Sequence, residues 1–145
     1  MPVYRFYNAK AGVHFYTASE SEKASVIANL SHIYTYEGVS YQINTSNPVN
    51  SQPLYRFYNA KAGVHFYTAS DAEKASVIAN LSHIYTYEGV AYKVSRTPTP
   101  MPVWRFYNFK KGVHFYTASE AEKNNVLANL SWTYKLDGIG YYIGQ

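Results

Sequence analysis

Residues 4–17 read YRFYNAKAGVHFYT, residues 55–68 repeat those letters without a change, and residues 104–117 read WRFYNFKKGVHFYT. The similarity continues through three aligned blocks of 40 residues, and the first block differs from the second at 5 positions and from the third at 15. A unit of about 40 residues rarely builds a stable core alone, so we expect the units to bury surface against one another. The sequence therefore predicts one domain over residues 1–145, with repeats at 3–43, 54–94 and 103–143.

The alternation of aromatic, β-branched and turn residues predicts four strands in each unit. Residues 4–8 and 13–17 are rich in strand formers and flank a turn that ends at Gly12. Residues 33–36 and 39–43 flank the pair Glu37-Gly38, which is typical of a second hairpin.

A short helix is predicted between the two hairpins. Ser19 is followed three residues later by Glu22, which is the spacing of a capping box, and the other two units repeat it. Val26, Ile27 and Leu30 then form an apolar stripe at helical spacing. We expect this stripe to pack against the sheet.

These elements predict an α+β, mainly β fold made of three tandem ββαββ repeats. The repeats favour a pseudo-threefold, propeller-like arrangement in a single domain, with a β-trefoil as the alternative, which a helix in every unit fits less well. The proline-containing stretches 44–54 and 95–103 are predicted to be linkers between units.

Composition excludes several classes of protein. The chain has no cysteine, so disulfides, thiol nucleophiles and cysteine-based metal sites are absent. Its net charge of +4 is modest, and it has no apolar run long enough to span a membrane, so neither nucleic-acid binding nor membrane insertion is expected. The chain opens directly on the first repeat, which fits a cytosolic protein or a secreted one whose signal was removed. A monomer and a homodimer both remain open.

The acidic residues do not form a catalytic pair in the sequence. All nine lie either at the predicted start of a helix, where capping explains them, or in the turn at Glu37, Glu88 and Asp137. A turn acid is expected to pair with an arginine, Arg5, Arg56 or Arg105, of its own or a neighbouring unit. A glycosidase needs two carboxylates that face one cleft, so the sequence predicts a protein that is not an enzyme.

Histidine occupies the same strand position in every unit, at His14, His65 and His114. Three imidazoles that converged on a central axis would offer a metal site. A strand histidine bonded to a neighbouring carbonyl or carboxylate is more common, so no metal and no cofactor are expected.

Aromatic and hydrogen-bonding side chains at equivalent positions favour ligand binding instead. Of the 26 aromatic residues 17 are tyrosine, which is more than a small core needs, because each buried phenol must find a partner. Aromatic faces stack on sugar rings, and polar groups bind the hydroxyls. The predicted ligand-binding residues are Arg5, Asn8, His14, Tyr16, Tyr36, Glu37, Arg56, Asn59, His65, Tyr67, Tyr87, Glu88, Arg105, Asn108, His114, Tyr116 and Asp137.

The motifs Tyr-Arg-Phe-Tyr-Asn, Gly-Val-His-Phe-Tyr-Thr and Tyr-Glu-Gly resemble a family of tandem-repeat domains in secreted bacterial and some fungal proteins. Those domains are often appended to cell-wall or polysaccharide hydrolases. The resemblance implies an extracellular or cell-surface, lectin-like module that binds glycans or cell-wall polysaccharide through up to three sites. The alternative is a structural or protein-interaction module, natural or engineered, that has no small ligand. The third unit departs from the motif at Phe109, Trp132, Leu136 and Asp137.

Overall fold

The computed structural model describes residues 1–43 and 50–143, and each unit contributes three strands and one helix. The expected α+β, mainly β class is confirmed. Unit 1 contains β1 (Pro2–Asn8), β2 (Val13–Thr17), α1 (Glu20–Asn29) and β3 (Thr35–Gln42). Unit 2 contains β4 (Ser51–Asn59), β5 (Val64–Thr68), α2 (Asp71–Asn80) and β6 (Thr86–Ser95). Unit 3 contains β7 (Met101–Asn108), β8 (Val113–Thr117), α3 (Glu120–Asn129) and β9 (Tyr134–Ile143).

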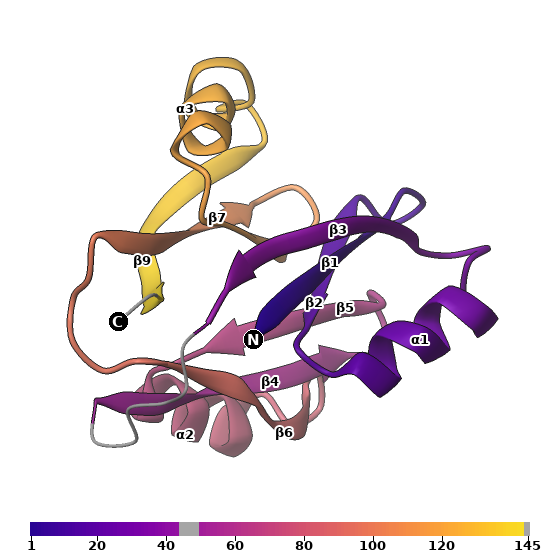
Figure 1. Ribbon diagram of the computed structural model, residues 1–145, viewed down its shortest axis with the longest axis horizontal. Helices are drawn as coiled ribbons and strands as arrows, with labels where there is room; N and C mark the ends of the chain where they lie inside the picture. Colours follow the sequence, from indigo (N-terminus) through magenta and orange to yellow (C-terminus); the bar gives the residue numbers. More distant parts are fainter. Residues whose placement is uncertain (44–49, 144–145) are drawn as a thin grey trace.

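The strands form antiparallel sheets. Within each unit, the first strand lies between the other two strands of that unit. Unit 1 forms a three-stranded sheet in the order β2-β1-β3, and units 2 and 3 share a six-stranded sheet in the order β5-β4-β6-β9-β7-β8. The two halves of the larger sheet meet at a single residue pair, Ser95 and Tyr142. Neither sheet closes on itself within the described residues. The three helices lie on the outside of the molecule, well apart from one another (Figure 1).

The second hairpin predicted in each unit is wrong, because the residues that follow the helix form one continuous strand. Arg5 pairs with Gly38 and Phe6 pairs with Tyr36, so Glu37 is an extra residue in a β-bulge. Gly38 has φ +96°, a value that suits glycine in a hairpin turn and in a bulge alike. Each unit therefore has three strands rather than four, and the bulge points the acidic side chain out of the ladder.

The helices begin where the sequence predicts, but only half of each capping box forms. Ser19 accepts a hydrogen bond from the Glu22 backbone N–H at 3.0 Å, whereas the Ser19 backbone N–H donates to Thr17 Oγ1. The Glu22 carboxylate is therefore not needed as a capping group and can bind a residue outside its own helix. The apolar stripe is also narrower than predicted, since Val26 is buried while Ile27 is 44% exposed.

Within the described residues, no helix has the length and apolar character needed to cross a membrane. The predicted linkers are shorter than expected, because β4 begins at Ser51 and β7 at Met101, which places Pro53 and Pro102 inside strands. The part of the first linker at 44–49 lies outside the described residues.

Each sheet buries both of its faces. In unit 1, Tyr4, Phe6 and Phe15 pack under Val26 of the helix, which gives the unit a small core of its own. The opposite face sends Val3 and Tyr16 to a central core that all three units share. This alternation follows from the period of two along a strand.

Tyrosine hydroxyls join the units across the central core. The Tyr67 hydroxyl accepts a hydrogen bond from the Tyr16 backbone N–H at 3.0 Å and donates to the Tyr16 carbonyl at 2.6 Å. The Tyr116 hydroxyl does the same to Tyr67, at 2.9 and 2.7 Å. The Tyr16 hydroxyl donates to the Tyr116 carbonyl, so the contacts run from each unit to another and return to the first. These hydroxyls replace the backbone partners that the inner edges of β2, β5 and β8 lack.

A second tyrosine layer lies beside the first. The hydroxyl of Tyr41 is 2.5 Å from the hydroxyl of Tyr92 and 2.5 Å from that of Tyr141, and the remaining pair is 3.2 Å apart. Each phenol can donate to one neighbour and accept from the other. A buried core therefore accommodates six phenols without leaving their oxygens unpaired.

Removing one of the joining hydroxyls is expected to destabilise the whole chain. A Tyr67→Phe substitution leaves the Tyr16 N–H and carbonyl buried without that partner, which should lower the free energy of unfolding by about 2–4 kcal/mol. Urea denaturation followed by circular dichroism measures this change. Tyr87→Phe is the matched control, because Tyr87 is 37% exposed and should change stability little. Equal effects of the two substitutions would contradict the role of the central hydroxyls.

Candidate functional site

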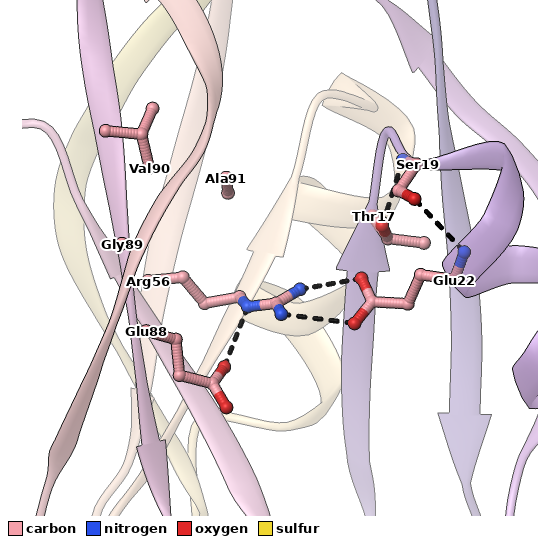
Figure 2. A pocket seen from close by; sticks show the side chains of 8 residues that line it. All are labelled: Thr17, Ser19, Glu22, Arg56, Glu88, Gly89, Val90 and Ala91. Carbon is pink, nitrogen blue, oxygen red and sulfur yellow. Dashed lines mark hydrogen bonds and ion pairs between the residues drawn. The ribbon is translucent and has the colours of Figure 1, made fainter.

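An arginine bound by two carboxylates lies at each junction between units. Arg56 of β4 donates through Nε to Glu88 at 2.9 Å, and through its two terminal nitrogens to both oxygens of Glu22 at 2.9 and 3.1 Å (Figure 2). Glu88 is the bulge residue of the same unit, and Glu22 comes from the first turn of α1 in the preceding unit. The bidentate contact fixes the two units relative to one another.

The other two junctions repeat this ion-pair cluster. Arg105 contacts Glu73 at 3.0 Å and Asp137 at 3.3 Å, and Arg5 contacts Glu122 at 3.1 Å and Glu37 at 2.8 Å. The predicted pairing of turn acid with arginine is confirmed in all three units. The partner from the neighbouring helix was missed, because the capping box fully explained that glutamate in the sequence.

Burial and charge act against each other on the helix glutamate. Burial of Glu22 favours its neutral form, but hydrogen bonds from Arg56 and Thr17 outweigh burial and lower the pKa of Glu22. The pKa of Arg56 is raised, because its hydrogen bonds to Glu22 outweigh the cost of burial. Both groups are therefore charged at neutral pH.

A histidine joins each ion-pair cluster from the neighbouring strand. His65 Nε2 lies 3.3 Å from Glu88 Oε1, and the imidazole packs on Phe15 of the preceding unit with ring centroids 4.5 Å apart. Burial and the adjacent Arg56 lower the pKa of His65 to about 3. The ring is therefore neutral at pH 7. Its Nε2 faces Glu88, and the buried Nδ1 has no hydrogen-bond partner among the described residues.

The histidines do not converge on a central axis. His14 packs on Phe115, His65 on Phe15 and His114 on Phe66, so each faces a different junction. The alternative of a shared three-histidine site is therefore wrong. The described residues contain no group of three histidine, aspartate or glutamate side chains arranged to hold a metal ion.

Two hollows flank the ion-pair cluster between units 1 and 2. One is a polar recess of about 270 Å³ bordered by Ser19 and the bulge at Gly89, and equivalent recesses of about 240 and 260 Å³ lie at the other junctions. The other is a larger groove of about 450 Å³ that also borders Arg56. We call it the inter-unit groove, and it is lined by Asn8, Phe15, Glu22, Val26, Leu30, Ile33, Tyr34, Arg56, Tyr58, Gly63, His65 and Glu88.

The inter-unit groove combines aromatic walls with charged and polar groups. Tyr34 follows α1, and Tyr58 is paired with His65 across β4 and β5 in the next unit. Burial and the nearby Tyr58 raise the pKa of Tyr34, which keeps its hydroxyl protonated. The tyrosine walls thus come from two different units.

The predicted ligand-binding residues separate into those at the junctions and those elsewhere. The arginines, histidines and bulge acids all lie at the junctions: Arg5, His14, Glu37, Arg56, His65, Glu88, Arg105, His114 and Asp137. Tyr36 and Tyr87 lie instead on the helix-facing side of their sheets, against Phe6 and Phe57, and do not line the groove.

Two predicted sets belong to the scaffold. Tyr16, Tyr67 and Tyr116 are each 1% exposed, so they form the central core and cannot touch a ligand directly. Asn8, Asn59 and Asn108 are also buried, and each accepts a hydrogen bond from a backbone N–H of the turn that follows it, although Asn8 also borders the inter-unit groove. The sequence could not separate these tyrosines from surface ones, since every unit repeats both kinds.

The three histidines predict that acid destabilises the protein. The pKa of each is lowered from 6.5, to about 3 for His65 and about 4 for His14 and His114, chiefly by burial. The unfolded chain therefore takes up protons that the folded chain excludes between about pH 6.5 and pH 4. The contribution of the histidines to the free energy of unfolding should be constant above pH 6.5 and should fall below that value by at most about 1.4 kcal/mol per pH unit for each histidine.

Urea denaturation at several pH values between 5 and 7.5 measures this dependence. Glu22 and Glu73, whose pKa values are lowered, lose their contribution only below about pH 4.5, so the loss above that value reports on the histidines. His65→Gln should make the dependence on pH shallower, whereas His32→Gln, at an exposed position, should not. A His65→Gln protein with an unchanged dependence would show that another group takes up the proton.

A family model described as "Domain of unknown function (DUF5648)" matches the chain twice, over residues 1–95 and 79–145. The two overlapping matches fit a chain built from tandem repeats. No curated protein and no solved structure matches this sequence.

Proposed function

Because the chain belongs to the DUF5648 family, whose description states no activity, we propose its function from the geometry: it is a multivalent, non-catalytic carbohydrate-binding protein. The observation that carries the proposal is the inter-unit groove, where tyrosine walls from two units meet a cluster of hydrogen-bonding side chains. Binding sites for small molecules typically combine apolar walls with a few fixed polar groups in this way.

The chemistry of the groove suits a sugar ring. Tyr34 and Tyr58 can contact the C–H faces of a pyranose, while the carboxylates of Glu22 and Glu88 can accept hydrogen bonds from its hydroxyls. Arg56 holds both carboxylates in place before the ligand arrives, which reduces the entropy lost on binding. The ion-pair cluster thus serves as a preorganised set of acceptors.

The same contacts support a role without catalysis. A glycosidase needs one protonated acid, which requires a carboxyl group with a raised pKa. Here Arg56 engages both carboxylates, and the pKa of Glu22 is lowered. Glu22 is therefore not prepared to donate a proton to a leaving oxygen at neutral pH.

Up to three sites follow from the three junctions, in a propeller-like arrangement of units. The site between units 2 and 3 contains Asp137 where the others have glutamate, and the site between units 3 and 1 contains Thr133 at the position of Ile33. We expect affinity to differ among the sites for these reasons. Leu136, which replaces Tyr36, lies outside the ion-pair cluster and should matter less.

The partner that we propose is a glycan or cell-wall polysaccharide outside the cell. The extracellular location rests on the resemblance of the repeat motifs to domains of secreted proteins. Several weak sites on one chain would bind a polymer or a decorated surface much more tightly than a free oligosaccharide, because linked sites raise the effective concentration.

A glycan array followed by isothermal titration calorimetry tests the proposal. Replacing the groove tyrosine in every unit (Tyr7→Ala, Tyr58→Ala, Tyr107→Ala) should weaken binding about tenfold or more, because the ring contact with the sugar is lost. Tyr87→Ala is the control outside the groove, and thermal unfolding verifies that each variant is folded. A Tyr16 variant is unsuitable, since it would damage the core.

Absence of glycan binding, or equal binding by the groove and control variants, would reject the proposal. The alternative is a protein-interaction module, which is favoured by the apolar side chains that each helix leaves outward. Ile27, Ile78 and Leu127 occupy equivalent positions and are 44, 45 and 43% exposed. Loss of a protein partner on replacing these three with serine would support that alternative.

A further inference from the structure

The ion-pair clusters concentrate negative charge on a chain that is positive as a whole. The three clusters together hold three arginines, three neutral histidines and six carboxylates, which gives each a charge of −1 at pH 7. The whole chain carries +4, so the remainder carries +7. A binding site whose charge is opposite in sign to that of the surrounding surface selects ligands by their charge.

The arginine in each cluster is already committed to carboxylates. All three guanidinium nitrogens of Arg56 donate to Glu22 or Glu88, at 2.9 to 3.1 Å. A ligand carboxylate or sulfate would have to displace Glu22 or Glu88 from Arg56, and the remaining glutamate would repel it. The residue that most often binds anionic sugars is therefore not available for that purpose here.

The groove offers a cation two kinds of favourable contact. Arg56 is the one permanent cation among the described residues that line it, so the carboxylates leave one negative charge without compensation. Tyrosine faces add attraction for an ammonium group, and this chain already uses that contact, with Lys23 Nζ 4.4 Å from the centroid of the Tyr4 ring.

We propose that the inter-unit groove, together with the equivalent positions at the other two junctions, binds amino sugars that carry a protonated amine, in preference to N-acetylated and acidic sugars. The inference rests on the proposed carbohydrate-binding function and names its ligand class. The ammonium group lies beside the bulge carboxylate, Glu88 or its equivalent, while the sugar ring contacts the tyrosine walls. The ligand is then a segment of a polysaccharide made of 2-amino-2-deoxyhexose units.

Calorimetry with three hexasaccharides at about pH 6 tests this selectivity on the full chain. The glucosamine hexamer should bind about tenfold more tightly than the N-acetylglucosamine hexamer, since one ionic contact is gained per site. A galacturonate hexamer should bind more weakly than both. The preference should decrease as salt is added, because ions screen a contact that is partly exposed.

Neutral replacements of the bulge acids identify the selecting group. The triple variant Glu37→Gln, Glu88→Gln, Asp137→Asn keeps an acceptor for arginine but makes each cluster neutral, and it should lose most of the preference for the amine. The matched control Glu20→Gln, Asp71→Asn, Glu120→Gln removes three charges from the helix starts, outside the clusters, and should retain the preference.

The outcomes separate this inference from the function on which it rests. If no hexasaccharide binds and the array is negative, the carbohydrate-binding proposal itself fails. Binding of the N-acetylated or acidic hexamer that equals or exceeds binding of the glucosamine hexamer overturns only the charge selectivity. Equal loss of preference in both triple variants would show that long-range charge, rather than the cluster, attracts the amine.

Discussion

The hydrogen bonds from tyrosine hydroxyls to the backbone of the preceding unit, with unit 3 preceding unit 1, hold this structure together. Each unit is a small sheet whose inner edge, β2, β5 or β8, would otherwise leave buried backbone groups without partners. Tyr67 supplies both a donor and an acceptor to residue Tyr16, as a neighbouring strand would. A phenol can do this because its oxygen both donates and accepts, and its ring fills the space beside the edge.

The candidate site depends on this joining of units, because no unit contains a complete site. Arg56 and Glu88 come from unit 2, whereas Glu22 and Phe15 come from unit 1. The central contacts fix the distance between units, and that distance lets a glutamate from a helix reach an arginine on the next sheet. Damage to the core should therefore damage the sites as well, whereas changes in the groove walls leave the core in place.

Local sequence rules predicted the secondary structure of each unit better than the contacts that its residues make in the folded chain. Ser19 caps its helix as its spacing indicates, and Gly12 ends the first hairpin turn. Gly38 has the positive φ that its neighbours suggest, but it belongs to a bulge rather than a hairpin, since one backbone conformation serves both. Glu22 was explained by capping, yet its carboxylate contacts another unit, because the ion pair with Arg56 is available only after the units meet.

The sequence by itself determined the number of units and the first hairpin and helix within each, and it predicted an arginine partner for the acid before Gly38 without choosing between its own and a neighbouring unit. These follow from local spacing, which acts within a short stretch of chain. Only the tertiary structure decided that Tyr16 is core while Tyr58 lines a groove, although both are strand tyrosines repeated in every unit. Burial depends on which surfaces of neighbouring units meet. Because the same residues recur in every unit, the repeat pattern alone does not identify the face of each sheet that the neighbouring unit covers.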